Sequence, residues 1–114
     1  KAVAVGAAED LAACGELAEA ADYLLFDARP PKGAERPGGH GAPFDWSLIG
    51  AYAAPTPFLL AGGLSPENVG AAIAAARANA AFAGVDVSSG VEARPGVKDA
   101  ARIAAFIAQA RASA

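Results

Sequence analysis

Two short apolar runs, each ending in a turn of glycine and serine, most constrain what this chain can fold into. The first covers residues 58–61 and continues as Gly62-Gly63-Leu64-Ser65, and the second covers residues 85–88 and continues as Ser89-Gly90. Short apolar runs of this kind are typical of parallel strands buried on both faces. Exposed N–H groups at a tight turn form a concave anion site. A plain strand–helix connection gives the same pattern, so each turn alone fits both interpretations.

The residues after the first run also have the pattern of a helix start. Ser65 can cap a helix, Pro66 suits the first helical position, and Glu67 favours the positive helix end. Gly62 and Gly63 let the backbone bend and come close to a ligand. Two successive strand–helix units with amide-rich turns fit the phosphate site that β/α barrels build after their last two strands.

The remaining apolar periodicity predicts four strand–helix units in all. The predicted strands cover residues 1–5, 23–27, 58–61 and 85–88. The predicted helices cover residues 7–21, 66–80 and 98–112, and a further one runs from an Asp45 cap through Trp46, Leu48, Ile49 and Tyr52. Leu11, Cys14 and Ala18 lie on one face of the first helix, and the last helix has Ile103, Phe106 and Ile107 at helical spacing. This order predicts one α/β domain over residues 1–114, with a parallel sheet and right-handed crossovers.

Residues 28–43 are rich in glycine and proline and carry Arg29, Lys32, Arg36 and His40. We expect a long ordered loop, and such loops in a compact domain are often functional. A histidine in a loop is most often solvated, so His40 is given no role in proton transfer.

Charge and cysteine content exclude several classes of function. The net charge of the 114-residue chain is −3 and no basic block occurs, which disfavours nucleic acid and anionic membranes as partners. No apolar run approaches the length of a membrane span. The single cysteine, Cys14, excludes an internal disulfide framework and favours the cytoplasm. Its mid-helix position without an evident base indicates packing rather than a nucleophile.

Motifs along the whole chain resemble those of the phosphoribosylanthranilate isomerase family of tryptophan biosynthesis. In the family's order they are Leu24-Leu25-Phe26-Asp27, Gly38-Gly39-His40-Gly41 with Phe44-Asp45-Trp46, residues 60–69, and residues 84–92 with Pro95-Gly96 and Lys98-Asp99. The resemblance implies a TIM (β/α)8 barrel and covers only its second half. Because full barrels need at least about 200 residues, this chain would be a parallel (βα)4 half-barrel that supplies strands five to eight.

The resemblance also implies a reaction and its residues. The family performs the Amadori rearrangement of N-(5-phosphoribosyl)anthranilate to the aminodeoxyribulose phosphate, without a metal or organic cofactor. Asp27 matches the general acid that protonates the furanose ring oxygen. The residues that match the substrate phosphate site are Gly62, Gly63, Ser88, Ser89 and Gly90. Asp86 could contact polar groups of the substrate, or it could be a buried acid with satisfied hydrogen bonds.

The chain departs from the family's pattern in two ways. His40 stands where the family usually has a small hydroxyl residue. The family's general base is a cysteine at the end of the first barrel strand, which Cys14 does not match, and the anthranilate-binding groups belong largely to the first half. We therefore expect half an active site, inactive alone, that requires the missing N-terminal half-barrel or a second copy of this chain. An open sheet would also expose Tyr23 and Leu25 to water.

Two other functions fit the sequence less well. One is a non-catalytic half-barrel module for phosphate binding or assembly. The other is a different phosphate-binding barrel, such as a histidine-pathway isomerase. Those enzymes typically use an aspartate on the first and fifth strands, and residues 1–5 contain none.

Overall fold

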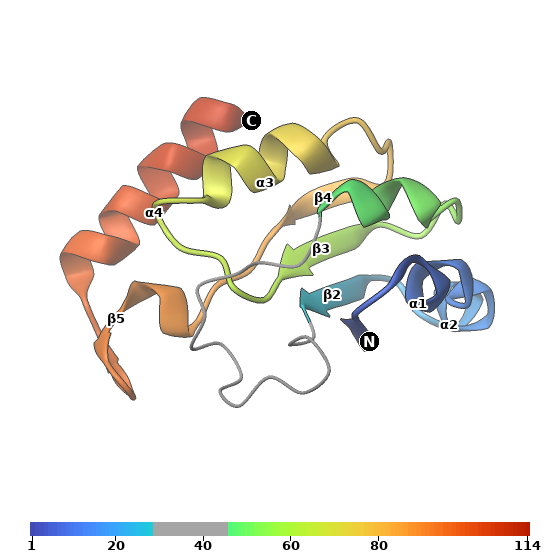
Figure 1. The fold of residues 1–114 in the computed structure, drawn as a ribbon, viewed down its shortest axis with the longest axis horizontal. Helices are drawn as coiled ribbons and strands as arrows, with labels where there is room; N and C mark the ends of the chain where they lie inside the picture. The colour runs from blue at the N-terminus through green and yellow to red at the C-terminus, as the bar shows by residue number, and fades with distance from the viewer. Residues whose placement is uncertain (29–45) are drawn as a thin grey trace.

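The computed structural model describes residues 1–28 and 46–114, which form an α/β fold around a parallel sheet of four strands (Figure 1). The sheet order is β1-β2-β3-β4, and every neighbouring pair is parallel, as the strand–helix alternation predicts. The strands are β1 (Ala2–Val5), β2 (Leu24–Ala28), β3 (Phe58–Ala61) and β4 (Phe82–Val85). β1 and β4 are the two edges of the sheet.

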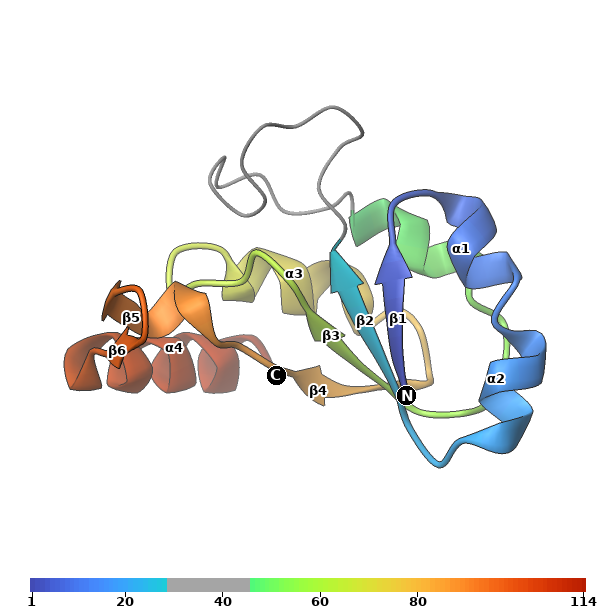
Figure 2. The ribbon, with the colours of Figure 1, turned by 90° about the horizontal axis from the view of Figure 1, so that it is seen from below.

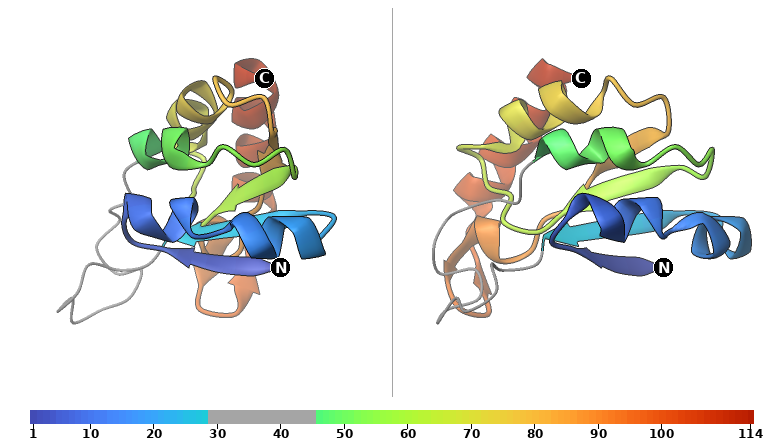
Figure 3. Two further views of the ribbon diagram at one scale, coloured as in Figure 1. Left: turned by 90° about the vertical axis from the view of Figure 1, so that its right-hand side faces the viewer. Right: turned by 45° about the vertical axis from the view of Figure 1, so that its right-hand side comes forward.

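Helices cover one side of this sheet. The described helices are α1 (Ala8–Ala12), α2 (Gly15–Ala20), the 3-10 helix η1 (Trp46–Ala51), α3 (Val69–Ala76), the 3-10 helix η2 (Ser89–Val91) and α4 (Ala100–Ser113). Figure 3 shows α1, η1 and α3 along one side of the strands, and α4 packs beside α3. A small antiparallel hairpin of β5 (Glu92–Arg94) and β6 (Val97–Lys98) lies at the start of α4, at the end of the molecule opposite to α1 and α2 (Figure 2). None of the described helices is long and apolar enough to cross a membrane.

The core follows from the two-residue alternation of the strands. On the helix-covered face, Phe26 and Phe58 are fully buried, and their rings stack with centroids 4.8 Å apart. Tyr52, from the segment after η1, meets the Phe26 ring edge-on at 5.0 Å. On the opposite face Leu25 is half-buried and Asp27 is exposed. Tyr23, which directly precedes β2, is 55% exposed, as expected, whereas Leu24 at the start of β2 is buried.

The single helix predicted over residues 7–21 is two helices, α1 and α2, so the prediction of one continuous helix was wrong. The face that it predicted to be buried is buried. The chain turns between α1 and α2, where the Cys14 amide donates to the Leu11 carbonyl at 3.2 Å in a tight three-residue turn. Gly15 follows, and glycine is a poor residue for the interior of a helix. Leu11, Cys14 and Ala18 are nevertheless all buried, as their spacing predicts.

The fourth strand lies earlier than predicted, at Phe82–Val85 instead of residues 85–88. The pairing of β3 with β4 contains an irregularity: Phe58 pairs with Phe82, and Leu59 then pairs with Gly84. A β-carbon at Gly84 would lie 3.2 Å from Leu59 Cδ2, so glycine suits this close approach. One further backbone bond, from the Asp86 amide to the Leu60 carbonyl at 2.9 Å, extends the ladder beyond the strand.

The two long C-terminal helices also differ from expectation in detail. α3 is shorter than residues 66–80, because the segment before it is a turn in which Asn68 Oδ1 accepts from the Ser65 amide at 2.8 Å. No side chain caps the N-terminus of α3, so the Ser65 cap predicted from the sequence was wrong. α4 begins after Asp99, whose carboxylate accepts from the amide of Ala101 at 2.9 Å.

The apolar face predicted for α4 is only partly buried. Phe106 is buried against the core, as expected. Ile103 and Ile107, at the same helical spacing, are 38% and 44% exposed. The reason is that α4 packs beside α3 and η2 at the margin of the layer, which leaves part of its circumference outside the core.

The edge of the sheet where the strands begin is fastened by one amide side chain. Asn79 Nδ2 donates to the carbonyls of Ile49 at 3.3 Å and Tyr52 at 2.9 Å. Asn79 Oδ1 accepts from the Ala81 amide at 2.9 Å, just before β4. These three bonds tie η1 and the segment after it to the start of β4.

Candidate functional site

The chemistry-bearing residues lie where the strands end. Asp27 is near the end of β2 and pairs in register with Ala61, the last residue of β3, which directly precedes Gly62. Asp86 follows the last residue of β4. Since the carboxyl ends of adjacent parallel strands meet at one edge of a sheet, the structure brings Asp27, Asp86 and the first glycine turn to the same edge. Ligands of open α/β sheets bind at this edge.

The first turn, residues 62–65 after β3, needs glycine for its backbone geometry. Gly62 and Gly63 have φ angles of 87° and 69°, in the left-handed region that other residues rarely adopt. Asn68 Nδ2 donates to the Gly63 carbonyl at 2.8 Å and so fixes the direction of that peptide group. The amides of Gly62 and Gly63 find no acceptor among the residues that the structure describes, and this leaves two N–H groups for a ligand.

The second turn, residues 88–90 after β4, presents two hydroxyl groups and contacts the first turn. Ser88 and Ser89 are exposed, and η2 closes the turn with a bond from the Val91 amide to the Ser88 carbonyl at 3.3 Å. A β-carbon at Gly90 would overlap the carbonyl oxygen of Leu64, so only glycine fits where the two turns meet. The structure therefore brings together the two turns that the sequence analysis singled out.

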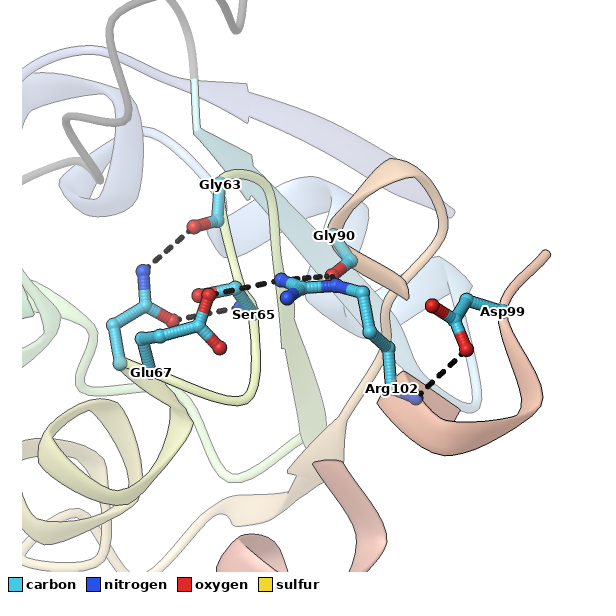
Figure 4. A network of polar contacts seen from close by, with 7 residues as sticks. Gly63, Ser65, Glu67, Gly90, Asp99 and Arg102 are labelled. Atoms are coloured by element: carbon cyan, nitrogen blue, oxygen red, sulfur yellow. Dashed lines mark hydrogen bonds and ion pairs between the residues drawn. The ribbon is translucent and has the colours of Figure 1, made fainter. Parts of the chain in front are cut away.

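Arg102 of α4 contacts both turns, and the sequence analysis missed it. Its Nε and Nη2 donate to the Gly90 carbonyl at 3.1 and 2.9 Å, and Nη2 also donates to Glu67 Oε1 at 2.9 Å (Figure 4). Glu67 stands in the turn that leads into α3. Since 35 positions separate Glu67 from Arg102, no local pattern shows the pair. The one available signal is that Arg102 follows the Asp99 cap by three residues, in the first turn of α4.

The β5–β6 hairpin is a second feature that sequence reasoning missed. Lys98 Nζ donates to Glu92 Oε2 at 2.6 Å and to the Ser88 carbonyl at 3.0 Å. The hydrogen bond from Lys98, and then that from the Gly96 amide, lower the pKa of the Glu92 carboxyl below its ordinary value of 4.5. The signal was the Pro95-Gly96 dipeptide, because Gly96 has a φ of 80° at the tip of the hairpin.

Two further candidates have clear outcomes. Asp86 is exposed, so its interpretation as a buried acid was wrong. Cys14 is buried, and burial, followed by the charge of Asp10, raises the pKa of its thiol above 9.0. A raised pKa disfavours the nucleophilic thiolate, which agrees with a packing role.

His40 and the Asp45 cap lie outside the described residues. Within the described ranges, no group of three or more His, Cys, Asp or Glu side chains is placed to hold a metal ion.

A parallel strand–helix sheet with its glycine and serine turns at the carboxyl edge places this chain in the TIM-barrel class of proteins. Residues 1–109 match the family model described as N-(5'phosphoribosyl)anthranilate (PRA) isomerase. The chain belongs to this family, whose members are isomerases of tryptophan biosynthesis.

Known members show how far the similarity extends. The N-(5'-phosphoribosyl)anthranilate isomerase of Rhodospirillum rubrum is 56% identical over 111 residues, which cover 97% of this chain and 49% of the relative. The crystal structure of the Thermotoga maritima phosphoribosyl anthranilate isomerase matches with a TM-score of 0.71 and 38% identity, over 98% of this chain and 50% of that one.

A third comparison concerns a structure with a bound ligand. It is a phosphoribosyl anthranilate isomerase in complex with reduced 1-(o-carboxyphenylamino)-1-deoxyribulose 5-phosphate. It matches with a TM-score of 0.66 and 34% identity, over 98% of this chain and 47% of that one. The chain thus spans about half the length of the curated relatives it matches.

Proposed function

We propose that this chain is the C-terminal half of a phosphoribosylanthranilate isomerase, a (βα)4 half-barrel that corresponds to strands five to eight. The family match over residues 1–109 and the coverage of about half of each relative support this assignment. The sheet order β1-β2-β3-β4 is that of four consecutive barrel strands. One observation carries the functional proposal: two turns with glycine backbones touch each other at the carboxyl edge, beside Asp27.

The substrate phosphate binds between the two turns in this proposal. Its ligands are the backbone amides of Gly62, Gly63 and Gly90 and the amides and hydroxyls of Ser88 and Ser89. A bound ligand with a 5-phosphate in a relative at 34% identity supports a phosphorylated substrate. Convergent amides stabilise a phosphate through several charge-assisted hydrogen bonds.

Asp27 is the general acid in the proposed Amadori rearrangement. Its carboxyl group gives a proton to the furanose ring oxygen as the bond between that oxygen and C1′ breaks, and the anthranilate nitrogen donates its electron pair to C1′. Removal of the C2′ proton then gives the enol, which tautomerises to the aminoketose. The exposed position of Asp27 beside the turns lets it reach the ribose of a substrate whose phosphate they hold. Asp86 is placed at the same edge to contact the substrate's hydroxyl groups.

The half-barrel carries only part of this chemistry. The base that removes the C2′ proton and the groups that bind the anthranilate carboxylate belong to the missing N-terminal half. We therefore propose that the chain alone does not catalyse the isomerisation. It acts with that half. A second copy of this chain would cover the open sheet face without supplying the base.

An assay of phosphoribosylanthranilate isomerisation tests this function. The 114-residue chain is measured alone and after mixing with an N-terminal half from a relative such as the Rhodospirillum rubrum enzyme. We expect turnover only in the mixture. Turnover by the pure chain near that of an intact enzyme contradicts the half-site. Phosphate binding without turnover in any mixture supports the non-catalytic module instead.

A further inference from the structure

We propose that Arg102 is a positioning residue that holds the two phosphate-binding turns in register, an inference that rests on the proposed function. The guanidinium joins Gly90 of the second turn to Glu67, which follows the first turn. These contacts are 2.9–3.1 Å long, within the range of good hydrogen bonds. Figure 4 shows Arg102 lying between the two segments.

The position of Arg102 is itself fixed. Its backbone amide lies 3.4 Å from the Asp99 carboxylate, which caps α4. The side chain therefore starts from an anchored helix end. Its planar fork can direct two N–H groups at one carbonyl oxygen and still reach a carboxylate. A lysine ammonium carries the same charge but lacks this fixed fork, so it cannot set both directions at once.

The contact also decides which backbone dipoles an anion meets. A carbonyl oxygen carries partial negative charge and repels phosphate, whereas an amide N–H attracts it. Arg102 engages the Gly90 carbonyl, and Lys98 engages the Ser88 carbonyl at 3.0 Å. Because cationic side chains bind both of these carbonyl oxygens, the groups of the second turn that remain for an anion are its N–H and hydroxyl groups.

Because the two turns are in direct contact, their relative position must be maintained for both to bind one phosphate. Gly90 lies so close to the Leu64 carbonyl that no β-carbon fits between them. A small separation of the turns would remove that contact and move the amides of Gly63 and Gly90 apart. A phosphate bound by amides from both turns then loses one set of ligands.

The test follows inorganic phosphate binding to the full 114-residue chain by backbone amide chemical shifts. In Arg102→Met we expect affinity to fall about tenfold, the size of a lost charge-assisted hydrogen bond. The shift changes at Ser89 and Gly90 should shrink, while those at Gly62 and Gly63 persist. Arg102→Lys should recover part of the affinity. Arg111→Met, on the last turn of the same helix, is the matched control and should bind like the wild type.

The outcomes separate this inference from the proposed function. If wild-type chain binds no phosphate at the turns, the proposed function fails and the inference with it. If the wild type binds there and Arg102→Met binds equally well with the same pattern of shifts, the positioning role is refuted alone. If Arg102→Met does not fold, Glu67→Ala decides, because it removes only the acceptor that links Arg102 to the first turn. A Glu67→Ala variant with wild-type affinity and shift pattern refutes the link, and a weakened one supports it.

Discussion

Lys98 binds Glu92 across the β5–β6 hairpin, with 2.6 Å between Nζ and Oε2. The same ammonium donates to the Ser88 carbonyl and hydroxyl at 3.0 and 3.2 Å. One cation thus joins the hairpin to the second turn of the proposed phosphate site. Protonation of the Glu92 carboxyl should therefore affect how firmly that turn is held.

Acid should loosen the hairpin through Glu92. Because the pKa of Glu92 is lower in the folded chain than its ordinary 4.5, the unfolded state binds the proton more tightly. The stabilisation is complete above pH 4.5 and is lost as the pH falls through the lowered folded value. Hydrogen exchange of the Gly96 amide measures this opening.

The variant Glu92→Gln should show a flatter acid dependence of that exchange. The control is Glu16→Gln, because Glu16 is an exposed acid in α2, far along the chain from the hairpin. An unchanged acid response in Glu92→Gln would assign the opening to another group.

Gly90→Ala should damage the site where the turns meet. The added methyl group overlaps the Leu64 carbonyl, and a backbone atom cannot move aside as a side chain can. Overpacking of this kind destabilises by about 1–3 kcal/mol, and we expect phosphate affinity to fall as well. Gly50→Ala is the control, since a β-carbon there meets nothing within 4 Å. Thermal melts with and without phosphate compare the two variants, and equal behaviour would contradict the close contact.

Phe26→Ala should remove the centre of the core. Phe26 is fully buried between Phe58 and Tyr52, with ring centroids at 4.8 and 5.0 Å. Replacing a buried phenylalanine with alanine typically costs about 3–5 kcal/mol in the free energy of unfolding. Urea denaturation measures the loss. Leu17→Ala, at a side chain 39% exposed on α2, should lose much less.

The central part of the fold could be predicted from sequence because its signals are local. β3 begins and ends where the apolar run does, and the buried face of Leu11, Cys14 and Ala18 follows from helical spacing. β4 was misplaced because Gly84 interrupts the apolar sequence in front of Val85, and only the pairing with β3 shows that the strand begins at Phe82. The kink before Gly15 likewise depends on a local turn that hydrophobic spacing does not show.

The candidate site divides in the same way. The glycines and serines of both turns stand out in the sequence because positive φ angles and close backbone approach restrict residue choice. Arg102 and Glu67 do not stand out, since a surface ion pair between distant segments has no local pattern. The direction of Asp86 depended on the end of β4 and could not be set before that strand was placed.

Asp27→Asn should nearly abolish turnover in a complete barrel that contains this half. Asparagine keeps the shape of the side chain but has no acidic proton for the ring oxygen. Loss of a general acid typically lowers the rate by about two to four orders of magnitude. Steady-state kinetics should show a large loss in kcat, and binding of a substrate analogue should change much less. Asp22→Asn, an exposed acid before β2, is the control. Near-normal kcat in Asp27→Asn would require another acid.

The isolated chain should associate with itself. β1 and β4 are the edges of the described sheet, and Tyr23, directly before β2, is 55% exposed. Unpaired strand edges invite pairing with another chain. Sedimentation velocity across micromolar concentrations should show dimers or larger species. Ala2→Lys on the β1 edge should weaken association, and Ala12→Lys on an exposed position of α1 should not. A stable monomer at all concentrations would show that these edges are protected.

The Asn79 amide has a consequence for which mutations this chain can accept. Asn79 donates two hydrogen bonds and accepts one, at the edge of the sheet away from the turns. Apart from asparagine, only glutamine carries an amide that can do both. The genetic code offers no single-nucleotide path from an asparagine codon to a glutamine codon. Every one-step amino-acid change at this position therefore breaks at least one of the bonds that tie η1 to β4.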